Sequence, residues 1–249
     1  MKSIPNIITL SSLFTACIGV ALAFSGNEVT AAWIILLCAL LDFSDGLAAR
    51  ILDARSELGM QLDSLADLIA FGLLPASILY SILSRLSHAL NPADIHFVWP
   101  WMAFFIPVFA ALRLGRFNLD TRQLSGFIGL PTPGMALIIA SLPLASLKWP
   151  GFGLFQTYLS AQQAAPWLIS VVAGVALLCW LMVSPIRMFS LKLKRISIRD
   201  YPLQSIFLAI SLVLLALFQY GALGPIMLFY LLLSLAGHSY QPGQTASQL

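Results

Sequence analysis

Hydrophobic residues in this chain form long runs that short polar segments interrupt. A helix needs about 20 apolar residues to cross a bilayer, because each residue adds about 1.5 Å along its axis. Runs near that length predict eight membrane-spanning helices, at residues 5–25, 29–49, 59–84, 97–116, 131–148, 167–189, 203–219 and 222–237. The last two are short and meet at Tyr220 and Gly221, which predicts a tight hairpin. The expected fold class is all-α, a polytopic membrane helix bundle.

The segments between these runs predict connections and no soluble domain. Residues 150–166 are rich in Gly and Gln and are bounded by prolines, so we expect a loop there, and residues 238–249 predict a polar tail. Composition agrees, since only 9% of the residues are charged, against about 25% in soluble domains. The net charge of +3 gives no indication of nucleic-acid binding.

The basic residues predict an orientation, because Lys and Arg concentrate in the cytoplasmic loops of membrane proteins. With the N terminus in the cytoplasm, eleven of the thirteen fall on the cytoplasmic side: Lys2, Arg50, Arg55, Arg113, Arg116, Arg122, Arg187, Lys192, Lys194, Arg195 and Arg199. Only Arg85 and Lys148 fall on the other side. We therefore expect a cytoplasmic N terminus.

Four aspartates lie inside apolar runs, where an unpaired carboxylate is costly. Asp42 and Asp45 are three residues apart near the end of the second run, so they share a helix face. Asp63 and Asp67 are four apart near the start of the third run and share a face as well. The short linker predicts antiparallel neighbouring helices. All four carboxylates should then converge near the cytoplasmic ends of these two helices.

Two kinds of chemistry suit such a cluster. The carboxylates could take up protons, as in a proton relay, or they could bind hard divalent cations. Ligation by oxygen alone suits Mg²⁺ or Mn²⁺, which commonly bridge carboxylates and phosphates. No histidine or cysteine joins the cluster, which argues against zinc.

Small residues beside the aspartates favour a phosphate ligand. Gly46, Ala49 and Gly59 would let a bulky ligand approach the helix backbones, although small residues in membrane helices also serve close helix packing. Arg50 and Ser56 offer donors for phosphate oxygens at the rim of the site.

At this point the residues resemble a known signature. The pattern Asp42-x-x-Asp45-Gly46-x-x-Ala49-Arg50, eight further residues, then Gly59-x-x-x-Asp63-x-x-x-Asp67 is similar to that of the CDP-alcohol phosphotransferases. The resemblance implies a six-helix catalytic core, usually homodimeric. It also implies that the four aspartates hold two divalent ions, Mg²⁺ or Mn²⁺, against the CDP pyrophosphate, with Asp67 as the general base.

The start of the chain adds to this resemblance. Residues 4–13, IPNIITLSSL, are similar to the family's opening helix, which implies that Asn6 and Thr9 line the CDP-lipid site. An alternative is that Asn6 caps the N terminus of that helix after Pro5. We expect a catalytic membrane core at residues 1–195, and a two-helix hairpin with a polar tail at residues 196–249.

Four later stretches narrow the acceptor: LIAFGLLPA at 68–76, ALRLGRFN at 111–118, FIGLPTPGMAL at 127–137 and LMVSPIRMFSLK at 181–192. Together they resemble the membrane-embedded phosphatidylserine synthases of bacteria and archaea. The resemblance implies CDP-diacylglycerol and L-serine as substrates, phosphatidylserine and CMP as products, and a bacterial inner membrane. Arg113, Arg116, Asn118 and Arg187 could bind the serine carboxylate or a phosphate, or the arginines could only set topology and touch lipid headgroups.

Other functions remain open. A related transferase could use glycerol phosphate or inositol phosphate as the acceptor. A transporter with buried aspartates would leave the spacing of Gly46, Ala49, Arg50 and Gly59 unexplained. Phosphatidylserine synthesis through paired H-x-K motifs is excluded, because none of the three histidines is followed two residues later by lysine.

Overall fold

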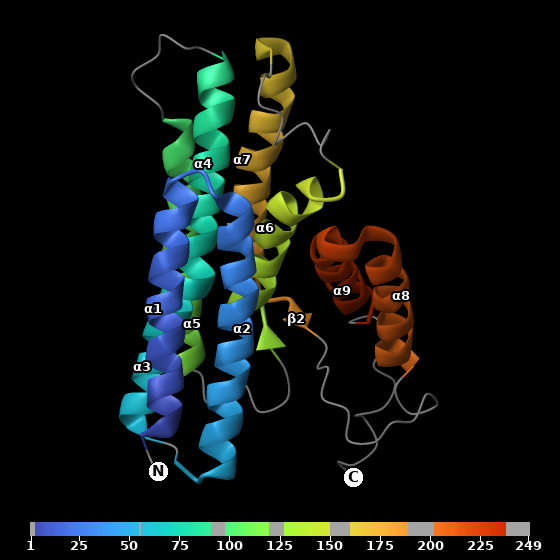
Figure 1. Ribbon diagram of the computed structural model, residues 1–249. Helices are drawn as coiled ribbons and strands as arrows, with labels where there is room; N and C mark the ends of the chain where they lie inside the picture. The colour runs from blue at the N-terminus through green and yellow to red at the C-terminus, as the bar shows by residue number, and fades with distance from the viewer. Residues whose placement is uncertain are drawn as a thin grey trace.

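The computed structural model describes residues 3–54, 56–90, 98–119, 127–149, 160–188 and 202–237, with the side chains of 127–128, 187–188, 202–205 and 235–237 left undescribed. Nearly all of this is helix (Figure 1). The elements are α1 Ile4–Phe24, α2 Glu28–Ile51, α3 Glu57–Leu68, η1 Ile69–Leu73, α4 Leu74–Leu90, η2 Trp99–Phe104, α5 Phe105–Leu119, β1 Phe127–Ile128, α6 Thr132–Ser146, α7 Ala161–Val183, β2 Arg187–Met188, α8 Pro202–Phe218, η4 Gln219–Ala222 and α9 Leu223–Gly237.

The predicted all-α class is confirmed, with one two-stranded ladder as the exception. There β1 pairs antiparallel with β2, so that Ile128 faces Arg187 along the backbone. Six described helical stretches are long and apolar enough to cross a membrane: Ile4–Phe24, Glu28–Ile51, Glu57–Leu90, Trp99–Leu119, Ala161–Val183 and Ile206–Ser234. The predicted count of eight spans is therefore not confirmed. At 15 residues, α6 and α9 are each about 22 Å long, less than the thickness of the hydrocarbon core.

The boundaries predicted for the sixth span are wrong at both ends. Helix α7 begins at Ala161, inside the predicted loop, because the Gln163 side chain accepts a hydrogen bond from the Ser160 amide at 3.1 Å and closes the first turn. The helix ends at Val183, since Ser184 precedes a proline and takes an extended conformation, with ψ of 151°. Residues 150–159 of the predicted loop lie outside the described residues, as do the boundary at 195/196 and the tail at 238–249.

Helix α4 forms the centre of the bundle. Its fully buried side chains include Leu74, Ile78 and Ile82, and α1, α2, α6 and α7 surround it. Gly19 lets α1 pack closely on α4, because an added Cβ there would lie 2.9 Å from the Leu74 side chain. Because α3, η1 and α4 form one helical stretch, this core also fixes the position of α3 against α1 and α5.

The predicted C-terminal hairpin is present. Gln219 has a φ of 49°, and the chain reverses there. The Phe207 ring of α8 then stacks on Phe229 of α9, with ring centroids 6.3 Å apart. Small residues dock the hairpin on α6: a Cβ added to Gly221 would meet the Cα of Ala145 at 3.2 Å. The hairpin therefore lies beside α6 and is separate from α1, α3 and α5 (Figure 1).

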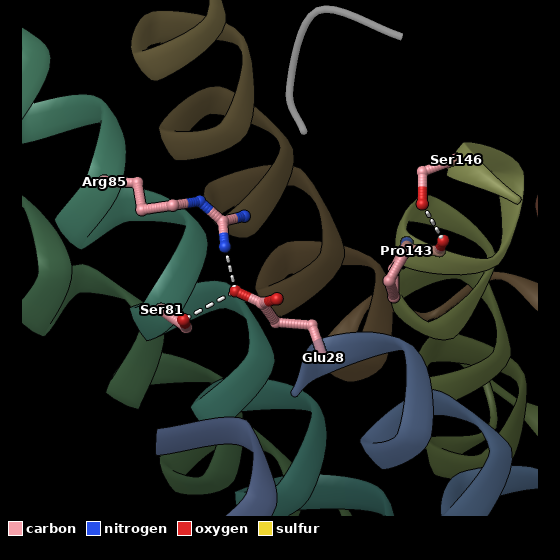
Figure 2. A network of polar contacts seen from close by, with 5 residues as sticks. All are labelled: Glu28, Ser81, Arg85, Pro143 and Ser146. Carbon is pink, nitrogen blue, oxygen red and sulfur yellow. Dashed lines mark hydrogen bonds and ion pairs between the residues drawn. The ribbon is translucent and has the colours of Figure 1, made fainter. Parts of the chain in front are cut away.

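A buried acidic residue ties the start of α2 to α4. Glu28 is only 5% exposed, and its carboxylate accepts a hydrogen bond from Ser81 at 2.6 Å and pairs with Arg85 (Figure 2). In the same view, Ser146 donates to the carbonyl of Pro143 at 2.7 Å near the end of α6. Arg85 thus neutralises a buried carboxylate. It is one of the two basic residues predicted to lie on the side of the membrane opposite the cytoplasm.

Replacing Arg85 with alanine should lower the free energy of unfolding by about 1–3 kcal/mol, because it leaves the Glu28 carboxylate without its cation. Thermal unfolding of the purified protein in detergent measures this. The double variant Glu28→Gln with Arg85→Ala should recover part of the loss. The ion pair has no structural role if the single variant unfolds at the wild-type temperature.

Candidate functional site

The four predicted aspartates lie on two antiparallel helices joined by a tight turn. Helix α2 ends at Ile51, and Asp53 takes a φ of 45° in the turn. Ser56 then caps α3, its Oγ accepting a hydrogen bond from the Gly59 amide at 3.0 Å. The chain reverses between the two helices, as the short linker predicts, but α2 and α3 scarcely pack on each other, because α1 packs against both. The predicted carboxylates meet across the space between α2 and α3.

Three of the carboxylates come together. Asp42, Asp63 and Asp67 each offer an oxygen, and these oxygens all lie within 4.8 Å of one another. Asp42 and Asp63 are within hydrogen-bonding range. Charges this close in a partly buried site repel strongly unless a cation or a proton lies between them. An oxygen-only donor set in this arrangement fits a hard divalent cation such as Mg²⁺ or Mn²⁺.

The fourth carboxylate is held by α1. Asp45 is 5% exposed, and Thr9 donates to its Oδ2 across 2.5 Å. The Thr9 hydroxyl also lies 3.0 Å from the Pro5 carbonyl, so its proton has two acceptors within reach. Asp45 is near enough for its charge to act on Asp63 and Asp67. The sequence predicted that Thr9 is near the site, but its contact with Asp45 was not foreseen.

The small residues beside the aspartates have different surroundings. Nothing lies within 4 Å of a Cβ added to Gly46, so this face of α2 is open for a ligand. A Cβ on Gly59 would stand 3.0 Å from Asn6 Oδ1, which shows that this glycine lets α1 approach α3. Ala49 is half-buried, and Arg50 is exposed in the last turn of α2.

The alternative interpretation of Asn6 as a helix cap is wrong. Helix α1 begins at Ile4, with Ser3 in the capping position, so Asn6 already lies in the first turn. Its side chain instead faces the start of α3 at Gly59. The physical reason is Pro5, which is tolerated in the first turn of a helix and allows the helix to begin earlier than the cap interpretation requires.

A buried arginine faces the cluster from α5. Arg113 is 8% exposed, and its charge acts on Asp67. One terminal nitrogen donates to Thr132 Oγ1 at 3.3 Å, whereas the Nε has no hydrogen-bond partner among the described residues. A buried donor without a partner is costly, so this Nε is available to an anionic ligand. Thr132 is 1% exposed at the start of α6, and the sequence analysis did not single it out. The prolines on either side of it indicate the start of a helix, but they do not indicate its contact with Arg113.

Of the other predicted acceptor residues, only Asn118 has a described contact beside the aspartates. The Asn118 amide donates to Ser64 Oγ at 2.9 Å and so links α5 to α3 beside Asp63. Arg116 is exposed near the end of α5. The backbone of Arg187 pairs with Ile128, close to the start of α6, but its side chain lies outside the described part of the chain.

Comparison with known proteins identifies the family. A model of the CDP-alcohol phosphatidyltransferase family matches residues 2–175, from the start of the chain into α7. The chain belongs to this family. The resemblance carried by the aspartate signature is therefore confirmed.

Curated relatives carry related names. The chain is 34% identical over 151 residues to a CDP-diacylglycerol–serine O-phosphatidyltransferase of Helicobacter pylori, covering 58% of this chain and 59% of the relative. An enzyme of the same name from Bacillus subtilis is 36% identical over 143 residues, or 57% of this chain and 76% of the relative. An archaetidylserine synthase of Methanothermobacter thermautotrophicus is 30% identical over 145 residues, 57% of this chain and 58% of the relative. The chain thus spans about three fifths of the length of the Helicobacter relative.

The two glycines of the signature should respond differently to alanine. Gly46→Ala should leave the protein as stable as the wild type or slightly more stable, because the added Cβ meets nothing and alanine favours helix by about 1 kcal/mol. Gly59→Ala should be less stable than Gly46→Ala by about 1 kcal/mol, because the Asn6 and Ser56 side chains must move. Thermal unfolding compares the two variants, and Asn6→Ala should relieve part of the effect at Gly59. Equal stability of the two glycine variants would contradict the contact.

Proposed function

We propose that this protein transfers the phosphatidyl group of CDP-diacylglycerol to L-serine and releases CMP. The observation that carries the proposal is the cluster of Asp42, Asp63 and Asp67, joined by Asp45, on a helix face that Gly46 leaves open. Membership of the family and the names of the curated relatives support the reaction class and the acceptor. A transporter with buried aspartates gives no reason for the open helix face at Gly46.

The donor half of the site binds the CDP headgroup. Asp42, Asp45, Asp63 and Asp67 would hold two divalent ions, Mg²⁺ or Mn²⁺, which neutralise the pyrophosphate and stabilise the leaving oxygen. The Thr9 hydroxyl orients Asp45. Gly46 and Ala49 leave room for the nucleotide, and Arg50, Ser56, Asn6 and Gly59 form the rim on which the phosphates rest.

The reaction is a single displacement at phosphorus. The serine hydroxyl oxygen attacks the phosphorus that carries the diacylglycerol, and the bond from this phosphorus to the oxygen of CMP breaks. The CMP oxygen keeps the electron pair, while Asp67 accepts the hydroxyl proton as general base. The other carboxylates are assigned to the ions, and no histidine occurs among residues 42–67 to activate a serine of the protein. Direct attack is therefore simpler than a phosphatidyl-enzyme intermediate.

The acceptor half of the site lies between α5 and α6. Arg113 offers its uncommitted Nε and Thr132 its hydroxyl, so that both can donate to the carboxylate of serine. The charge of Arg113 also acts on Asp67, which supports a position for the acceptor beside the proposed base. Arg116, Asn118 and Arg187 are proposed to guide serine or phosphate groups at the edge of this pocket.

The remaining features of the function are proposed on the same basis. The aspartate end of the bundle faces the cytoplasm of a bacterial inner membrane, because the basic residues concentrate at that end of the predicted topology. Residues 1–195 form the catalytic core, residues 196–249 the hairpin and tail, and two chains form a homodimer.

The deciding experiment offers the purified protein CDP-diacylglycerol with serine, glycerol phosphate, inositol or inositol phosphate. Of the four acceptors, only serine should give CMP. CMP formation should stop in excess EDTA and resume when Mg²⁺ or Mn²⁺ is added, because the carboxylates are proposed to bind the substrate through the ions. Asp67→Asn is the matched control and should abolish CMP formation. CMP release with a different acceptor would assign a related transferase, and full activity in EDTA would refute the metal site.

Arg113→Lys should raise the KM for serine by about tenfold, because lysine keeps the charge but loses the planar pair of donors. The KM for CDP-diacylglycerol should change much less. Thr132→Val should act in the same direction, and Arg85→Lys, which lies beside Glu28 and away from the proposed site, serves as the control. An equal rise in the KM values for serine and for CDP-diacylglycerol would indicate that Arg113 binds a phosphate of the donor and not the serine carboxylate.

A further inference from the structure

A groove separates the C-terminal hairpin from the rest of the bundle. Its volume is about 430 Å³, and it is lined by Trp33, Leu36, Leu144, Leu215, Gln219, Tyr220 and Leu223. Trp33 and Leu36 lie five and eight residues after Glu28, so the groove lies about 7–12 Å along α2 from its start. Asp42 lies about a further 9 Å along the same helix. The groove is therefore nearer the start of α2 than the proposed active site is.

The polar and apolar groups of this groove are arranged along its length. Leu36, Leu144, Leu215 and Leu223 form an apolar wall. Gln219 and the Tyr220 ring lie at the hairpin turn, at one end of the lining. Three features gather at that end: the Trp33 ring 5.3 Å from Tyr220, the Trp149 ring 5.5 Å from Phe218, and the Lys148 ammonium on the carbonyl of Leu217. Aromatic rings and a lysine at one level are typical of the membrane–water interface.

The walls of the groove are fixed to one another, so it cannot close by a simple shift of the hairpin. Lys148, just after α6, bonds to the last turn of α8, and Gly221 packs closely on Ala145, where an added Cβ would lie 3.1 Å from the Ala145 Cβ. The contact of Trp33 with Tyr220 joins the hairpin turn to α2. Water is a poor occupant along the leucine wall, because a bound water needs two to four polar partners. In a bilayer, hydrocarbon is the solvent that fills such a space.

We propose that this groove binds one acyl chain of a membrane phospholipid from the leaflet opposite the aspartate cluster. The chain lies along Leu36, Leu144 and Leu215, and the glycerol esters and phosphate lie beside Gln219, Tyr220 and the Lys148 charge. A second protein copy would place a side chain there but would not match the polar end and apolar wall so directly. The bound lipid is distinct from the proposed substrate, which binds further along α2, and it joins α2 to the hairpin.

The test uses the full chain in vesicles of phosphatidylglycerol that contain a phospholipid with a photoreactive diazirine in one acyl chain. After illumination, mass spectrometry of peptides should place the label on the groove residues Leu36, Leu144, Leu215 and Leu223. Leu215→Trp, which fills the groove, should lower this labelling by about tenfold, because it removes the contacts of the bound chain. Ile206→Trp, at a similarly exposed position on the opposite side of α8, is the matched control and should leave it unchanged.

A second measurement distinguishes the loss of the bound lipid from misfolding of the Leu215→Trp variant. Native mass spectrometry after delipidation should detect one retained phospholipid on the wild type and on Ile206→Trp, and none on Leu215→Trp, with all three proteins eluting as the same species on gel filtration. Equal labelling of the groove and of the opposite side of α8 around Ile206 in the wild type would mean ordinary surrounding lipid and would overturn the proposal. So would a groove without label, or labelling that Leu215→Trp does not change.

Discussion

The structure depends on one electrostatic constraint, the placement of four carboxylates at the ends of two apolar helices. Each carboxylate at membrane depth costs several kcal/mol unless it has a partner. The surrounding helices supply some of these partners: α1 provides the Thr9 hydroxyl to Asp45, and α5 provides the charge of Arg113 to Asp67. Asp42 and Asp63 lie close to each other, and their mutual repulsion is what the proposed divalent ions would offset.

The two ends of α2 show the difference between a structural acid and one that is proposed to be functional. At the start of the helix, Glu28 is satisfied by Ser81 and Arg85 and needs nothing further. At the other end, Asp42 has only other carboxylates within reach of the described side chains, beside the open face at Gly46. Both acids lie in the same apolar helix, so burial alone does not separate them. What separates them is whether the protein itself completes their hydrogen bonds and charge.

The sequence predicted the helices and the aspartate cluster because both follow from local spacing. Asp42, Asp45, Asp63 and Asp67 lie at helical intervals on either side of a short linker, which leaves little freedom in how they meet. The early start of α7 depends on a side chain of Gln163 that reaches back one turn, and the overall hydrophobic pattern does not reveal it. The hydrogen bond from Arg113 to Thr132 joins α5 to α6, and no helical spacing in the sequence relates these two residues. Tertiary contacts of this kind need the packed fold.

The turn of π-helix at η1 explains how Arg113 comes to lie near Asp67. A π turn takes an extra residue, so it rotates α3 relative to α4 and lets the carboxylate face of one differ from the buried face of the other. Within this turn, Gly72 packs against α5, where an added Cβ would lie 3.4 Å from the Cβ of Ala110. Arg113 lies one turn beyond Ala110, and Asp67 lies about one turn before Gly72 on the adjacent, antiparallel stretch. A close contact between two small residues thus sets the distance between the buried cation and the proposed base, which connects helix packing to the chemistry of the site.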